Sequence, residues 1–202
     1  MDWPPLPREF YARDPIAVAR ELLGKILMRE SADGLASGRI VEAEAYLSSR
    51  DPACHANRGR NRKNATMFGP AGHAYVYMIH ARWCLNAVTE DVGCASAVLI
   101  RALEPLAGIP LMQGRRGLEE LRDLARGPAR LCQALAVTKA LDGHDFTLGR
   151  DLWIATDPSA NGSPRRIHRS RRIGVTSAHS RLLRFFLADN AFVSGKRSAR
   201  RR

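Results

Sequence analysis

Polar and apolar residues alternate over residues 40–47, and this pattern predicts a β-strand with two chemically different faces. The apolar members share one face and can pack into a core. The other face carries Glu42, Glu44 and Tyr46. Two carboxylates and an aromatic ring therefore lie together on a surface that is either open to solvent or the wall of a polar cleft.

Mixed helices and strands are predicted along the rest of the chain, without a repeating strand-helix order. A helix begins at Asp14-Pro15 and ends at Gly24, and residues 48–70 form a long polar surface loop. Further helices are predicted at residues 118–125 and 128–139. The expected strands are residues 26–29, 38–47, 74–79, 84–89, 95–103, 152–155 and 183–187, with hairpin turns at residues 32–34 and 90–93.

Size and composition favour one domain. The chain has 202 residues, of which 45% are hydrophobic, and it shows neither a repeat nor a break in composition. We expect a single domain over residues 1–195, followed by a basic tail over 196–202 that lacks order without a ligand.

Location and metal content are also expectations from the sequence. No apolar run is long enough to span a bilayer, and the first residues do not resemble a signal peptide. We therefore expect a cytoplasmic, nucleoid-associated protein, or a nuclear one in a eukaryote, that acts as a monomer. Cys54, Cys84, Cys94 and Cys132 lie far apart without the spacing of zinc ligands, which predicts reduced thiols and no metal.

Positive charge is concentrated at the C-terminus. Residues 165–202 contain twelve Arg or Lys and a single acid, Asp189, and account for almost all of the net charge of +12. Such density favours a nucleic-acid partner, although a solvated tail would look the same. The residues predicted to contact the DNA backbone are Arg169, Arg171, Arg172, Lys196 and Arg197.

Several stretches, in order, resemble the 3-methyladenine (alkyladenine) DNA glycosylases. The matching stretches are VEAEAYL at 41–47, DPACH at 51–55, MF at 67–68, YVY at 75–77, Asn86, LIRALEP at 99–105, GP at 127–128, LCQAL at 131–135, RIGV at 172–175 and LRFF at 183–186. This resemblance implies an α+β fold, a single mixed domain around a curved, largely antiparallel β-sheet with peripheral helices. It is unlike the glycosylases that are built on a helix-hairpin-helix.

Catalytic roles follow from the resemblance. An enzyme that acts on a stacked base must first rotate the nucleotide out of the duplex. In the family, the residue at the position of Glu44 activates the water that attacks the sugar, and the residue at Arg101 orients this water together with a main-chain carbonyl near Val175. Spacing alone does not exclude Glu42 as the base.

The base pocket and the wedge are implied in the same way. Tyr46, His55 and Tyr77 match the rings that sandwich the flipped base, and Asn86 matches the residue that excludes normal purines. The chain departs from the family at the wedge, where His80 replaces a common tyrosine. Met78, or the neighbouring Ile79, is expected to share this role with His80.

The expected activity is monofunctional base excision from double-stranded DNA that contains damaged purines, such as 3-methyladenine, 7-methylguanine or hypoxanthine. No lysine occurs in the matching pocket stretches, so we expect neither a Schiff base nor strand cleavage, and no cofactor. Two alternatives stay open at this stage. One is a non-enzymatic basic DNA- or RNA-binding protein, and the other is a hydrolase of free nucleosides.

Overall fold

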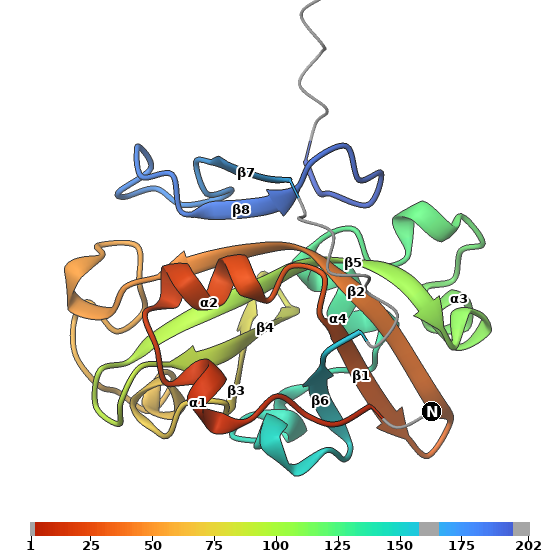
Figure 1. Cartoon of the computed structure of the whole chain (residues 1–202), viewed down its shortest axis with the longest axis horizontal. Coiled ribbons are helices and arrows are strands. Elements are labelled where there is room, and N and C mark those ends of the chain that lie inside the picture. Colours follow the sequence, from red (N-terminus) through yellow and green to blue (C-terminus); the bar gives the residue numbers. More distant parts are fainter. Residues whose placement is uncertain (1–2, 158–165, 196–202) are drawn as a thin grey trace, which may run out of the picture.

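One antiparallel sheet dominates the computed structural model, which describes residues 3–157 and 166–195 (Figure 1). Within these residues the sheet has eight strands and does not close into a barrel. The main path runs β3-β4-β5-β2-β1-β6, and β8 pairs with both β2 and β7. The strands are β1 (Ile26–Ser31), β2 (Gly34–Tyr46), β3 (Ala74–Ile79), β4 (Arg82–Thr89), β5 (Ser96–Ala107), β6 (Leu152–Ala155), β7 (Ile167–Ser170) and β8 (Arg184–Leu187).

Short helices surround the sheet. The α-helices are α1 (Arg8–Tyr11), α2 (Pro15–Glu21), α3 (Ile109–Arg116) and α4 (Pro128–Ala134). Single 3-10 turns are η1 (Ser48–Arg50), η2 (Ala65–Phe68), η3 (Leu121–Asp123), η4 (Lys139–Leu141) and η5 (Phe146–Leu148). The Asp14 side chain caps α2 by accepting from the backbone N–H groups of Ile16 and Ala17, as the Asp-Pro signal predicts. No helix of the described residues is long and apolar enough to cross a membrane.

β2 is the strand around which the sheet is organised. Its first half pairs with β1, its second half pairs with β8, and β5 runs along its other edge. The pairing with β5 is interrupted by two adjacent bulges, since Ile40 pairs with Leu103 and Glu42 with Ala102, but Ala43 pairs with Ile100. The register is therefore offset for one pair and then restored, at the point where the polar face of β2 begins.

The two faces of the central strands differ as the alternation predicts. Ala43 and Ala45 of β2 and Ile100 of β5 are fully buried in the main hydrophobic core. Helices α2 and α4 contribute apolar residues to this same core and pack against β2, β4 and β5. The opposite face collects the tyrosines, glutamates and arginines that form the candidate site.

Three predictions about the helices were inaccurate. Residues 118–125 form only the 3-10 turn η3, because Ala125 accepts a hydrogen bond from the backbone N–H of Leu103 and Arg126 bridges to Ala102. α3 was missed because it begins after a left-handed Gly108 and contains Gly114. α4 stops at Ala134 instead of Lys139, since Ala136 adopts a left-handed φ of 50°.

Candidate active site

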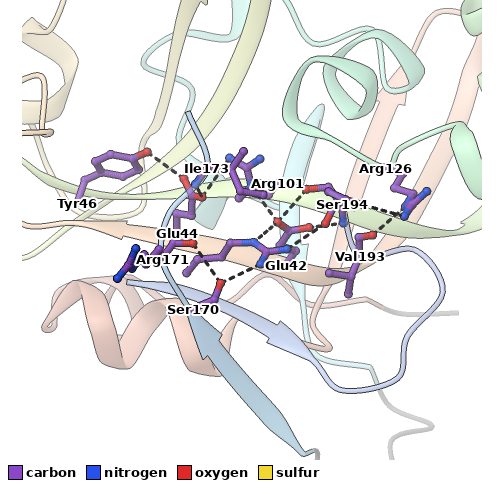
Figure 2. A network of polar contacts seen from close by, with 12 residues as sticks. Glu42, Glu44, Tyr46, Arg101, Arg126, Ser170, Arg171, Ile173, Val193 and Ser194 are labelled. Atoms are coloured by element: carbon purple, nitrogen blue, oxygen red, sulfur yellow. Dashed lines mark hydrogen bonds and ion pairs between the residues drawn. The ribbon is translucent and has the colours of Figure 1, made fainter. Parts of the chain in front are cut away.

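The carboxylates of β2 are buried rather than exposed. Glu42 and Glu44 both have 0% relative exposure, and each is surrounded by donors (Figure 2). Arg101 of β5 reaches both of them, with Nε 2.9 Å from Glu42 Oε1 and Nη1 3.2 Å from Glu44 Oε1. The acidic face of the strand is therefore the wall of an internal polar site.

Glu44 is held by three groups from three parts of the chain. Its Oε1 accepts from the backbone N–H of Ile173 at 2.8 Å and faces Arg101, whereas Oε2 accepts from the Tyr46 hydroxyl at 2.9 Å. Burial raises the pKa of the Tyr46 hydroxyl, and the adjacent Glu44 carboxylate raises it further. Tyr46 therefore keeps its proton and remains a donor to Glu44.

Glu42 has a different set of partners. Arg101 and Arg184 donate to Oε1 through their Nε atoms, and Ser194 donates through its hydroxyl and its backbone N–H. Burial alone would raise the pKa of Glu42, but the two guanidinium groups and the hydrogen bonds hold this pKa below its ordinary value. Glu42 is thus bound to arginines and to Ser194, whereas Glu44 contacts Tyr46, a residue that lines the aromatic cavity.

The prediction that Arg172 contacts the DNA backbone does not fit the structure. Its side chain is buried in a two-pronged ion pair with Asp51, with Nη1 and Nη2 lying 2.5 and 2.8 Å from the two carboxylate oxygens. Nη1 also donates to the carbonyl of Ala45, and the guanidinium stacks over the Tyr46 ring at 4.5 Å. Arg172 thus fixes one wall of the site from inside.

An aromatic cavity lies next to the carboxylates. It is lined by Tyr46, Ala53, His55, Met67, Tyr75, Tyr77, Asn86 and Ala97. Three of the predicted sandwich rings and the predicted selectivity residue are therefore brought together. Sequence reasoning missed four of the lining residues; Tyr75 could have been found from its period-two spacing to Tyr77, whereas Ala53 and Met67 lie on the irregular loop.

The cavity is narrow in this conformation. Its volume is about 20 Å³, which corresponds to about one water molecule. The rings of His55 and Tyr77 meet edge to face, with centroids 4.5 Å apart and planes at 75°. A base stacked between two rings needs parallel planes roughly 7 Å apart, twice an ordinary contact distance. The cavity therefore does not admit a purine unless one or more of its lining side chains move.

His55 is tied to its surroundings at two atoms. Its Nδ1 lies 2.9 Å from the Tyr75 hydroxyl, and its backbone carbonyl accepts from the buried Asn64 side chain. Desolvation lowers the pKa of the imidazole below its ordinary value. The ring is therefore neutral at pH 7, which suits contact with a positively charged purine.

The predicted wedge residues lie at the tip of the β3–β4 hairpin. Met78 and Ile79 are 52% and 50% exposed, which is unusual for apolar side chains of this size. His80 and Ala81 form the two-residue turn, and both adopt positive φ angles of 47° and 58°. Positive φ at both positions is the mark of a type I′ turn, whose twist matches that of the two strands it joins.

The remaining predicted site residues differ in their exposure to solvent. Val175 is half-buried on the same short segment as Ile173, which contacts Glu44. Arg169 and Arg171 are exposed, as a DNA contact requires, whereas Lys196 and Arg197 lie outside the described residues. Sequence reasoning did not single out four further exposed cations on the loop that follows His55, namely Arg58, Arg60, Arg62 and Lys63.

Acid should destabilise this site. Arg172 holds the pKa of Asp51 below its ordinary value despite the opposing effect of burial, and the pKa of Glu42 is lowered as well. Their contribution to stability is therefore complete above the unfolded-state pKa of about 4 and is lost as the pH falls through the lower folded-state values. We expect the free energy of unfolding, measured with urea from pH 7 to 3, to fall more steeply in the native protein than in the double variant Asp51→Asn/Arg172→Met. Parallel curves would contradict this.

Comparisons with known proteins find relatives that match almost the whole chain. The sequence profile described as methylpurine-DNA glycosylase (MPG) matches residues 9–191. The chain is 47% identical over 198 residues to a Mesorhizobium japonicum protein, covering 98% of this chain and 93% of the other. It is also 47% identical over 193 residues to a Carboxydothermus hydrogenoformans protein, covering 95% and 99%. Both relatives carry the name "Putative 3-methyladenine DNA glycosylase". The chain belongs to the methylpurine-DNA glycosylase family.

Proposed function

We propose that the protein excises alkylated or deaminated purines from duplex DNA by hydrolysis of the N-glycosidic bond, with Glu44 as the general base. As a family member it is a DNA glycosylase, a hydrolase of N-glycosyl bonds that acts on alkylated bases. The observation that supports this mechanism is the fully buried Glu44 carboxylate beside an aromatic cavity.

The contacts of Glu44 indicate which oxygen takes the proton. Each carboxylate oxygen has two lone pairs. Oε1 faces two donors, the Ile173 N–H and Arg101, whereas Oε2 accepts only from Tyr46 among the contacts of the described residues. Oε2 therefore has an acceptor site for the attacking water. Arg101, 3.2 Å from Oε1, fixes the direction of the carboxylate and, with a main-chain carbonyl near Val175, orients the water.

The reaction follows from these positions. As the bond between the purine and the sugar C1′ breaks, positive charge develops on the sugar, and the Glu44 carboxylate stabilises it. The water then adds to C1′, its proton passes to Glu44 Oε2, and the bond electrons leave with the purine. The products are the free base and an abasic site. A purine that is already cationic leaves readily, since its departure neutralises it.

The cavity selects the base by stacking. On entry, the purine separates His55 from Tyr77 and lies between the rings, close to Tyr46. Asn86, which donates to the Tyr75 carbonyl at 3.0 Å, is fixed at the cavity wall, where it crowds the exocyclic groups of normal purines. Hypoxanthine lacks an exocyclic amino group, whereas 3-methyladenine and 7-methylguanine keep theirs but have cationic rings that stack well on aromatic side chains and leave readily.

The hairpin tip should be needed to open the duplex. Replacing both Met78 and Ile79 with serine removes the exposed apolar groups that fill the gap left by the flipped nucleotide. We expect base release from a fully paired duplex to slow about tenfold, while release from single-stranded DNA stays unchanged. Val92→Ser is the matched control, since Val92 is 70% exposed in a different hairpin turn. Equal slowing on both substrates would argue against a wedge.

Single-turnover base release tests the proposed function directly. Duplexes that carry one 3-methyladenine or one hypoxanthine are compared with an unmodified duplex, and the abasic product is assayed for strand breaks without alkali. We expect release from the damaged duplexes, with an intact strand at the abasic site. Tight binding without release from either damaged duplex would favour a non-enzymatic DNA-binding protein.

A further inference from the structure

Glu42 is a second buried carboxylate that the proposed reaction does not use. Arg101 donates to its Oε1 at 2.9 Å, Arg184 donates to the same oxygen at 2.7 Å, and the Ser194 hydroxyl donates at 2.9 Å. Its Oε2 accepts from the backbone N–H of Ser194 at 2.5 Å. Burying a carboxylate costs desolvation free energy, which these four hydrogen bonds offset. The arrangement raises the question of what Glu42 does in the site.

The arginines raise an electrostatic problem for the reaction. Arg101 lies 3.2 Å from Glu44, next to which the sugar becomes positive. Arg184 contacts Glu42, the carboxylate that Arg101 also contacts. In a buried site these charges oppose the formation of a cation. Glu42 contacts both guanidinium groups, so that the cluster holds two carboxylates and two arginines and carries no net charge.

Glu42 also fixes the orientation of the Arg101 guanidinium group. Glu42 holds Nε of Arg101, whereas Glu44 faces Nη1 of the same group. Two anchored atoms fix the direction of the planar guanidinium, which a single contact would leave free to rotate. Figure 2 shows the two carboxylates side by side, with Tyr46 and Ile173 near Glu44 and Ser194 near Glu42.

Ser194 is itself held in place by the segment that contains it. Arg126 donates to the carbonyls of Val193 and Gly195, and Arg184 donates to the carbonyl of Ser194. Ser194 is 8% exposed, so this segment is packed rather than loosely attached. The C-terminal segment therefore supplies two of the four donors to Glu42.

We propose that Glu42, clasped by Ser194, is a positioning residue of the glycosylase site: it orients Arg101 toward Glu44 and offsets the positive charge of Arg101 and Arg184 while the sugar becomes cationic. This inference rests on the proposed function of Glu44. It assigns to the C-terminal segment a part in the chemical step that is separate from DNA binding.

The principal test is Glu42→Gln, assayed by single-turnover release of 3-methyladenine at saturating duplex over a range of pH. Glutamine keeps the shape but removes the charge. We expect the plateau rate to fall about 10- to 100-fold, as when supporting residues of other sites are removed, with duplex affinity unchanged. The acid limb of the pH profile should move to lower pH, because loss of the Glu42 charge leaves Arg101 and Arg184 uncompensated and opposes the uptake of a proton in the cluster.

A lower plateau rate together with an acid limb at lower pH distinguishes a positioning role of Glu42 from a general loss of local structure. If Glu42 only held the fold together, its loss would admit water and let Arg101 drift away, and the acid limb would stay or move to higher pH. Either result, or a wild-type plateau rate, would overturn the proposal. A fall in rate that merely matches a fall in the folded fraction, measured by circular dichroism, would do so as well.

Milder variants keep the test independent of folding. Ser194→Ala removes one donor to Glu42 and should slow release several-fold, whereas Ser194→Thr keeps the hydroxyl and should restore the rate. Ser170→Ala is the matched control, because the Ser170 hydroxyl contacts Arg184 but not Glu42. It should leave the rate unchanged, and equal losses in the two alanine variants would contradict the proposal.

A parallel Glu44→Gln measurement tells the two hypotheses apart. If that variant keeps its rate, the proposed function of Glu44 fails. If it loses its rate while the Glu42 and Ser194 variants match the wild type, only the role of Glu42 fails.

Discussion

Replacing Glu44 with glutamine is expected to slow base release by about 10²- to 10⁴-fold, the range that a lost general base produces. The amide oxygen can still accept from Ile173 and Arg101, so the local structure should survive. The amide cannot take a proton from water, and it lacks the charge that stabilises a cationic sugar. The measurement is single-turnover release of 3-methyladenine from duplex DNA at saturating enzyme.

A matched control removes a glutamate outside the site. Glu104 of β5 lies on the same strand as Arg101 but is only half-buried, and it contacts Arg39 and Asn190. Glu104→Gln should keep the wild-type rate. Binding of both variants to the damaged duplex should match that of the native protein. Release by Glu44→Gln at the native rate would refute the assignment of the general base.

Arg172→Met should be the most destabilising of the single substitutions considered. It leaves the Asp51 carboxylate buried without its partner, and breaking such pairs costs about 3–5 kcal/mol in the free energy of unfolding. The Tyr46 ring also loses the guanidinium stacked on it, so that base release should weaken in the fraction that remains folded. Urea unfolding at pH 7 measures the first effect.

The neighbouring arginine provides the control for this change. Arg171 is exposed, and Arg171→Met should alter stability by no more than about 0.5 kcal/mol while weakening DNA binding in a salt-dependent way. The double variant Asp51→Asn/Arg172→Met should recover part of the lost stability, since it removes the unpaired charge. If Arg171→Met and Arg172→Met change the free energy of unfolding by the same amount, the buried ion pair stabilises the fold no more than an exposed arginine does.

Strands were predicted more accurately than helices, for a physical reason. Alternation along β3 and β4 reports directly which residues face the core, and the hairpin between β4 and β5 was found from it. The end of α4 follows a Schellman arrangement, in which Val137 N–H donates to the Cys132 carbonyl and Ala136 takes the left-handed position. Glycine usually marks that position, so its absence concealed the end of the helix.

Some residues of the candidate site could be predicted from the sequence and others could not. Glu42, Glu44 and Tyr46 could be grouped because strand periodicity places them on one face of β2, whereas Tyr77 of β3 was grouped with Tyr46 by the family resemblance. The burial of Arg172 could not be read in the same way, because an arginine in a basic stretch looks like a DNA contact until its partner Asp51 is known. Contacts between residues 121 positions apart leave no periodic signal in the sequence.

The contact between Glu42 and Ser194 joins positions 152 residues apart. Closing such a long loop costs more chain entropy than pairing neighbouring strands, so the hairpins β1–β2, β3–β4 and β4–β5 can form before β8 and the segment after it dock. We therefore expect the carboxylate cluster to be completed only after the central hairpins have formed.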